Sequence, residues 1–152
     1  MSLRSNRFSQ ALLLSAVLVS CNSDRPEPAE VVLSPDDLRV RITRTASHPF
    51  LSRYRLVLLV ERSNICTGSM ELFPDTGYAG RRNLYRHASG EVSLVGQYDV
   101  RRIEPKTCAI QLIEFRAWDA QALFLGSFDL DQEKMWQFIP AAIRPELPFE
   151  KQ

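Results

Sequence analysis

Apolar and polar residues alternate along most of this chain, and this two-residue period constrains the fold more than any other feature. In residues 38–44 (LRVRITR) every second side chain is apolar, and residues 53–62 (RYRLVLLVER) repeat the pattern with some apolar residues on both faces. A period of two places successive side chains on opposite faces of a β-strand. Both segments are therefore predicted to be strands with one buried face.

Further strand-like segments follow, separated by turn-forming residues. PDTG at residues 74–77 is a strong turn signal, and the expected strands are residues 66–73, 92–102, 108–118 and 122–130. The last two flank a short polar break and are expected to pair as a central hairpin. About seven short strands favour an all-β fold, a small antiparallel sandwich or barrel.

The C-terminal part of the sequence permits two interpretations. Asp131 could cap a short helix through residue 138, which Pro140 would end. A last strand over the same residues is the alternative. Residues 36–152 are expected to form a single β domain, since a chain of this length can bury its own core.

The first twenty residues have a different composition. Arg4 and Arg7 precede a short apolar run at residues 11–19 (ALLLSAVLV). A positive start and an apolar stretch of this length are typical of a secretory signal peptide and too short for a comfortable membrane span. Residues 1–20 are therefore predicted to be a cleaved signal peptide.

The apolar run ends in Leu18-Val19-Ser20-Cys21. This stretch resembles the lipobox of bacterial lipoprotein precursors. The resemblance covers residues 1–21 only, and it implies that Cys21 is lipidated and becomes the first residue of the mature protein. Asn22 follows where an aspartate commonly retains such proteins in the inner membrane. The resemblance therefore implies an outer-membrane anchor facing the periplasm.

The residues after Cys21 are polar and contain two prolines, in the sequence NSDRPEPAE at residues 22–30. Such a composition suits an extended tether. Residues 21–35 are expected to be a lipidated, flexible N-terminus that holds the domain about 30 Å from the bilayer.

Two cysteines remain besides Cys21, namely Cys66 and Cys108. An even remainder in an exported chain indicates a disulfide, which would tie the third strand to the late hairpin and could cross the two sheets. Two free buried thiols or an incomplete metal pair are the alternatives. No cofactor or metal is expected, because His48 and His87 lack the spacing of zinc ligands.

The charge balance argues against nucleic-acid binding. All 18 acidic residues and all but two of the 19 basic residues lie after residue 20, so the expected mature chain has a net charge of about −1. A nucleic-acid-binding domain needs a basic surface instead. The membrane, through the lipid on Cys21, is the partner that the lipobox resemblance implies.

No catalytic motif is recognisable in the chain. The weak candidates for chemistry are residues that also have ordinary structural roles: His48, His87, Asp129, Asp131, Trp118 and Trp136. Histidines in loops, carboxylates at a strand end and tryptophans in a core are the simpler interpretation of these residues.

The strongest binding candidate is TGYAGRRNLYR at residues 76–86. Arginine and tyrosine are enriched in binding hot spots. The candidate partner-binding residues in this segment are Tyr78, Arg81, Arg82, Tyr85 and Arg86. They would suit an acidic protein surface or a carboxylated glycan; arginines on the solvent face of a hairpin are the alternative.

Three functions are compatible with this sequence. The first is a lipid-anchored, non-enzymatic envelope protein whose β domain binds a protein partner in an assembly, pilot or scaffold role. The second is a periplasmic immunity protein that neutralises a delivered toxin. The third is an enzyme acting on envelope glycan, which would need a cleft joining carboxylates such as Asp129 and Asp131 to a histidine.

Overall fold

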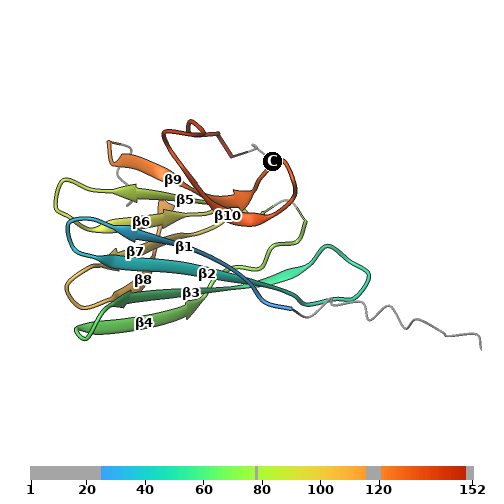
Figure 1. The fold of residues 1–152 in the computed structure, drawn as a ribbon, viewed down its shortest axis with the longest axis horizontal. Helices are drawn as coiled ribbons and strands as arrows, with labels where there is room; N and C mark the ends of the chain where they lie inside the picture. Colours follow the sequence, from blue (N-terminus) through green and yellow to red (C-terminus); the bar gives the residue numbers. More distant parts are fainter. Residues whose placement is uncertain (1–24, 78, 116–120, 150–152) are drawn as a thin grey trace, which may run out of the picture.

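The computed structural model describes residues 25–77, 79–115 and 121–149, and it confirms the all-β prediction. Within these ranges there are ten strands in two antiparallel sheets and no helix, and the sheets pack as a sandwich (Figure 1). The strands are β1 (Glu27–Leu33), β2 (Leu38–Ala46), β3 (Tyr54–Arg62), β4 (Cys66–Glu71), β5 (Arg82–Arg86), β6 (Val92–Val95), β7 (Val100–Glu104), β8 (Ala109–Ile113), β9 (Leu123–Leu130) and β10 (Trp136–Pro140).

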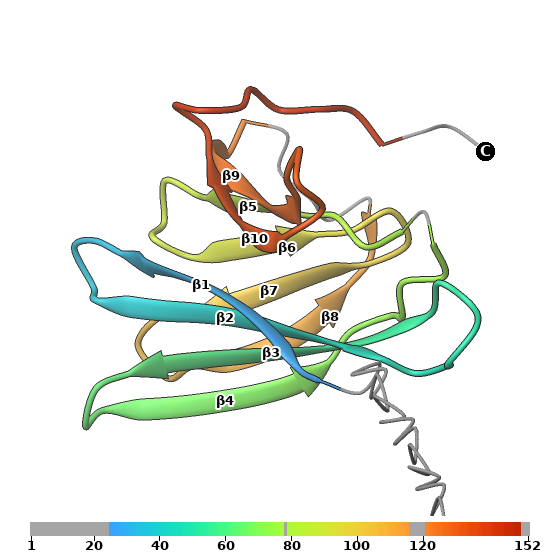
Figure 2. The same cartoon turned by 45° about the vertical axis from the view of Figure 1, so that its right-hand side comes forward.

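The strand order places two pairs of sheet edges next to each other. One sheet has the order β1-β2-β3-β4, and the other has the order β10-β9-β5-β6-β7-β8. Strand β1 contacts β10 along one side of the sandwich, and β4 contacts β8 along the other (Figure 2). The two sheets therefore meet at both sides of a shared core.

The core fills the space between the sheets, as the two-residue period predicts. The predicted inward residues of β2 and β3 are fully buried, except for Tyr54 at the strand end, which is half-buried. From the six-stranded sheet, β5, β6, β7 and β9 contribute apolar side chains to the same cluster. The fully buried members are Leu38, Val40, Ile42, Leu56, Leu58, Val60, Leu84, Val92, Ile103 and Phe128.

A second, smaller cluster lies on the outer face of the six-stranded sheet. Its buried members are Tyr85, Val95 and Val100, and the partly buried Phe124 and Phe149 pack against them. Phe149 belongs to the segment after β10, so the C-terminal segment covers part of this outer face (Figure 2).

The predicted disulfide is confirmed. Cys66 at the start of β4 is bonded to Cys108, which precedes β8, with a Cα–Cα distance of 5.6 Å. Because β4 and β8 are edge strands of different sheets, the bond crosses the sandwich as the sequence suggested.

The expected single strand over residues 92–102 is wrong. It is two strands, β6 and β7, joined by a tight turn in which the Gly96 N–H donates to the Asp99 carbonyl at 2.8 Å. The alternation of apolar residues continues through the turn, so the period alone does not reveal it. This division contributes to the higher strand number, ten instead of about seven.

The expected central hairpin is also wrong. Strand β8 pairs with β7 at the edge of the sheet, whereas β9 pairs with β5 and β10. Residues 116–120, which include Trp118, lie outside the described residues. The C-terminal helix is absent from the described ranges as well, and the alternative last strand, β10, occurs instead.

The boundary of the tether needs a correction. Strand β1 begins at Glu27, inside the stretch 21–35 that the sequence assigns to a flexible tether. Glu30 forms an ion pair of 2.7 Å with Arg41 on β2, and Ala29 is buried. An edge strand also tolerates Pro28, whose missing N–H need not serve a neighbour. The signal peptide and Cys21 lie outside the described residues.

Candidate binding site at the loop end of the sandwich

One end of the sandwich, here called the loop end, gathers the start of β1 and the turns between several strands. It holds the β2–β3 loop (residues 47–53), the segment between β4 and β5 (residues 72–81), and the turns at residues 96–99 and 131–135. The bridge between Tyr54 and Asp75 joins the loops of the four-stranded sheet to the segment that leads into β5.

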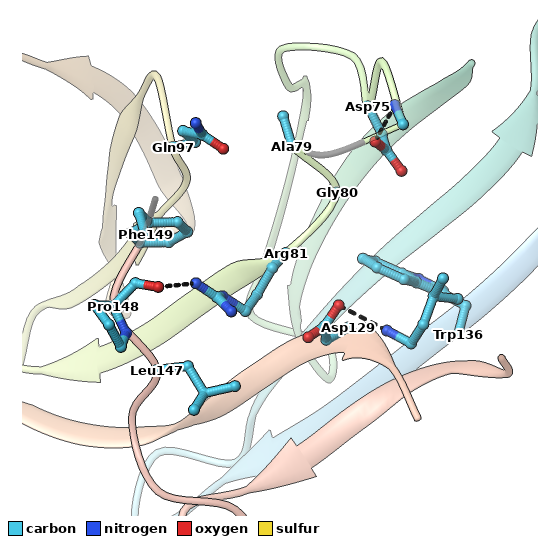
Figure 3. A pocket seen from close by; sticks show the side chains of 12 residues that line it. Asp75, Ala79, Gly80, Arg81, Gln97, Asp129, Trp136, Leu147, Pro148 and Phe149 are labelled. Carbon is cyan, nitrogen blue, oxygen red and sulfur yellow. Dashed lines mark hydrogen bonds between the residues drawn. The ribbon is translucent and has the colours of Figure 1, made fainter. Parts of the chain in front are cut away.

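A pocket of about 480 Å³, here called the Arg81 pocket, opens at this end (Figure 3). Its walls come from the β4–β5 segment, the β6–β7 turn, the adjoining ends of β9 and β10, and the C-terminal segment. The lining residues are Asp75, Gly77, Ala79, Gly80, Arg81, Gln97, Asp129, Leu130, Trp136, Leu147, Pro148 and Phe149.

Arg81 crosses this pocket and holds the C-terminal segment. Its Nη2 donates a hydrogen bond of 2.6 Å to the carbonyl of Pro148, and its guanidinium lies 4.8 Å from the centre of the Phe149 ring (Figure 3). A guanidinium at this distance from an aromatic face makes a cation–π contact. Arg81 therefore recognises an extended segment through its backbone and its aromatic side chain.

Tyr85 holds the same segment from beneath. Its hydroxyl donates to Glu146 Oε1 at 2.7 Å and accepts from Asn83 Nδ2 at 3.1 Å. Burial and the hydrogen bond to the Glu146 carboxylate raise the pKa of Tyr85 well above its ordinary value of about 10. Tyr85 therefore remains a neutral donor throughout the physiological pH range.

The two carboxylates of the pocket are engaged by other groups. Asp75 accepts the Gly77 N–H at 2.8 Å and lies 3.5 Å from Arg44 Nη2. Asp129 forms an ion pair of 2.8 Å with Arg144, and its other oxygen accepts the Leu130 N–H. Since arginines neutralise both acids, the charge of Arg81 gives the pocket its positive character.

Buried charges support the pocket from inside the sandwich. Arg82 donates to the Phe73 carbonyl at 2.6 Å and lies 3.8 Å from Asp99, which also lies 3.3 Å from Arg101. Burial lowers the pKa of Arg82, and the Asp99 carboxylate opposes that shift. An arginine nevertheless stays charged in proteins, so this cluster depends on its carboxylate for compensation.

The structure does not place the predicted partner-binding residues on one common surface. Arg82 is buried inside the sandwich and Tyr85 is buried beneath the C-terminal segment, whereas Arg81 lines the pocket. Arg86 lies at the opposite end of β5, where it donates to the Ser34 carbonyl. Tyr78 lies outside the described residues.

The remaining candidates for chemistry have local structural contacts. The Nδ1 atom of His48 accepts two backbone N–H groups within its loop, and His87 is hydrogen-bonded to Ser93 at 2.7 Å. Asp131 accepts the N–H groups of two residues in its own turn. The indole of Trp136 donates to the Ile42 carbonyl at 3.1 Å, across the two sheets.

The Arg81 pocket contains one arginine that contacts the C-terminal segment and two acids that are paired with other arginines. No histidine lines it, and among the described residues no three histidine, cysteine or acidic side chains lie close enough to hold a metal ion. The described ranges also contain no helix long and apolar enough to cross a bilayer. No protein-family model, curated protein or solved structure matches the chain.

Sequence reasoning missed the groups that complete this pocket. Asp75 lies in the predicted PDTG turn, and Glu146, Pro148 and Phe149 follow the last element that the sequence predicts. Their spacing from Arg81 in the sequence gives no signal, because the C-terminal segment returns to the loop end only after β10 has crossed the sheet (Figure 2).

Proposed function

We propose that this protein is a lipid-anchored envelope protein whose β domain binds a protein partner in an assembly, pilot or scaffold role. The proposed location in the envelope is inferred from the N-terminal sequence, in which Cys21 follows a signal-like apolar run. The Cys66–Cys108 disulfide is consistent with this location, because such bonds persist in oxidising compartments outside the cytoplasm. The anchor would hold the protein at the outer membrane, facing the periplasm.

The single observation that carries the binding role is the way in which Arg81 and Tyr85 hold residues 146–149. A backbone carbonyl, an aromatic ring and a carboxylate of an extended segment are each engaged by one of these two side chains. The same contacts are those by which proteins recognise peptides. The proposed partner therefore presents an extended segment with an acidic and an aromatic residue, which takes the place of residues 146–149 on Arg81 and Tyr85.

To test the binding role, the mature protein serves as bait, and the partners bound to it are captured from cross-linked envelope extracts. Arg81→Ala removes the hydrogen bond and the cation–π contact, and we expect it to reduce capture of the partner at least tenfold. Arg55→Ala is the matched control, since Arg55 is an exposed arginine on the four-stranded sheet whose ion pair with Glu71 is open to solvent.

The result separates the proposed role from its alternatives. If the wild-type protein and Arg81→Ala capture equal amounts of partner while their thermal unfolding curves show that both are folded, that result would contradict a binding role for the Arg81 pocket. Capture of a secreted toxin instead of an envelope protein would favour an immunity function.

A further inference from the structure

The β2–β3 loop (residues 47–53) carries the most exposed large apolar side chain of the described chain. Phe50 is 90% exposed, and its neighbour Leu51 is 49% exposed. In Figure 1 this loop projects beyond the other turns of the loop end. An isolated exposed apolar residue is ordinary, but two adjacent ones on a projecting loop form a small apolar tip.

The structure of the loop holds this tip outward. The Nδ1 atom of His48 accepts the backbone N–H groups of Phe50 and Leu51, at 3.2 and 3.1 Å. The Ser47 N–H donates to the Arg53 carbonyl at 2.9 Å and closes the base of the loop. Phe50 is thus exposed by a folded turn whose backbone groups are already paired within the loop.

The loop also lies beside the point where the N-terminal segment enters the domain. A pocket of about 470 Å³ is lined by Arg25 and Glu27 together with residues of the loop, among them Phe50 and Leu51. Arg25 is only four residues after Cys21, and four extended residues span at most about 14 Å. A lipid on Cys21 would therefore place the bilayer close to this loop.

The charges around the apolar tip also favour contact with the bilayer. Arg25 and Arg53 are both exposed, whereas Glu27, the acid that lines the same pocket, is paired with Arg44 at 3.2 Å. Basic residues near a bilayer are attracted to anionic lipid headgroups. Apolar side chains flanked by arginines are the composition of segments that lie in the membrane interface.

We propose that Phe50 and Leu51 insert into the interfacial region of the bilayer that holds the acyl chains of Cys21. This inference rests on the proposed lipid anchor. The inserted loop fixes the sandwich with its loop end toward the membrane. The Arg81 pocket, which also lies at the loop end, is then on the side of the domain that faces the bilayer.

The test uses the purified lipidated protein in vesicles of phosphatidylethanolamine and phosphatidylglycerol at a ratio of about 3:1. Phe50→Trp places a fluorophore at the tip, and Ile65→Trp is the matched control. Ile65 is 62% exposed in the β3–β4 turn, at the opposite end of the sandwich (Figure 1). Emission of the wild-type protein, with its two native tryptophans, is subtracted from both.

We expect brominated phospholipids to quench at least half of the emission of the new tryptophan at position 50 and to leave that at position 65 unchanged. Vesicle flotation and the intact mass report on the anchor independently. An acylated, floating protein whose position-50 tryptophan is not quenched overturns the inference and leaves the anchor standing. A protein that carries no acyl chain and does not float overturns both.

Discussion

The guanidinium of Arg82 lies 3.8 Å from the carboxylate of Asp99 between the two sheets, and only 2% of each side chain is exposed. Arg101 shares the same carboxylate at 3.3 Å. One buried acid therefore serves two buried arginines directly behind the Arg81 pocket. Burying charges is costly, and a cluster of this kind is stable only while every charge keeps its partner.

Asp99→Asn removes that shared negative charge while keeping the shape of the side chain. Both buried arginines then lose their nearest carboxylate, so we expect the free energy of unfolding to fall by about 3–5 kcal/mol. Urea denaturation measures the change. Glu71→Gln is the control, because it breaks the exposed Arg55–Glu71 pair and should cost less than about 1 kcal/mol. Equal effects of the two variants would contradict the buried cluster.

The disulfide predicts a second stability difference. The bond closes a loop with a sequence separation of 42 residues, so replacing both cysteines by alanine should lower the free energy of unfolding by about 3–4 kcal/mol on chain-entropy grounds. Reducing the wild-type protein should have a similar effect, and the Cys66→Ala/Cys108→Ala protein should not respond to reductant. An unchanged denaturation midpoint after reduction would show that the bond contributes nothing.

Gly68 on β4 lies against the backbone of Cys108, beside this disulfide. A Cβ atom at Gly68 would overlap the backbone carbonyl of Cys108. Gly68→Ala should therefore push β4 away from β8 and destabilise the protein by about 1–3 kcal/mol or more. The adjacent Ser69→Ala lies on an exposed position and should change stability by less than about 0.5 kcal/mol. Thermal or urea unfolding of both variants makes the comparison.

The hydrogen bond between Tyr85 and Glu146 predicts a dependence of stability on alkaline pH. The pKa of Tyr85 is raised in the folded protein, so its contribution is fully present below the unfolded pKa of about 10. Above that pH the unfolded state loses the proton while the folded state keeps it, and stability falls by up to about 1.4 kcal/mol per pH unit.

Tyr85→Phe tests this pH dependence. At pH 8 it should cost about 1–2 kcal/mol, because the carboxylate of Glu146 loses its donor. The difference in unfolding free energy between the wild-type protein and Tyr85→Phe should shrink as the pH rises from 9 to 11. A difference that stays constant across this range would mean that Tyr85 ionises alike in both states.

Local sequence patterns predicted the parts of the fold that depend on neighbours along the chain. Strands β2 and β3 follow from the alternation of Leu38, Val40 and Ile42 and its counterpart in residues 53–62, because one residue in two faces the core. The disulfide followed from the two cysteines that remain besides Cys21 in a chain expected to be exported. The same period hid the β6–β7 turn, since a tight turn of this length leaves the alternation unbroken.

The remaining features depend on partners that are distant in the sequence. Strand β1 looks polar, but its acids Glu27 and Glu30 pair with arginines of β2. Arg82 is buried because Asp99 and the Phe73 carbonyl accept its charge inside the sandwich. Composition alone predicts that such charged residues are exposed to solvent, because a sequence does not show which of them form ion pairs in the fold. Among the predicted partner-binding residues that the structure describes, Arg81 alone lines the pocket.

The intact mass of the protein purified from its native membrane tests the proposed lipid anchor most directly. The account predicts a chain that begins at Cys21, carries a diacylglyceryl group and an amide-linked acyl chain, and retains the bond between Cys66 and Cys108. The mass of the complete 152-residue chain without any acyl group, recovered from the soluble fraction, would contradict it.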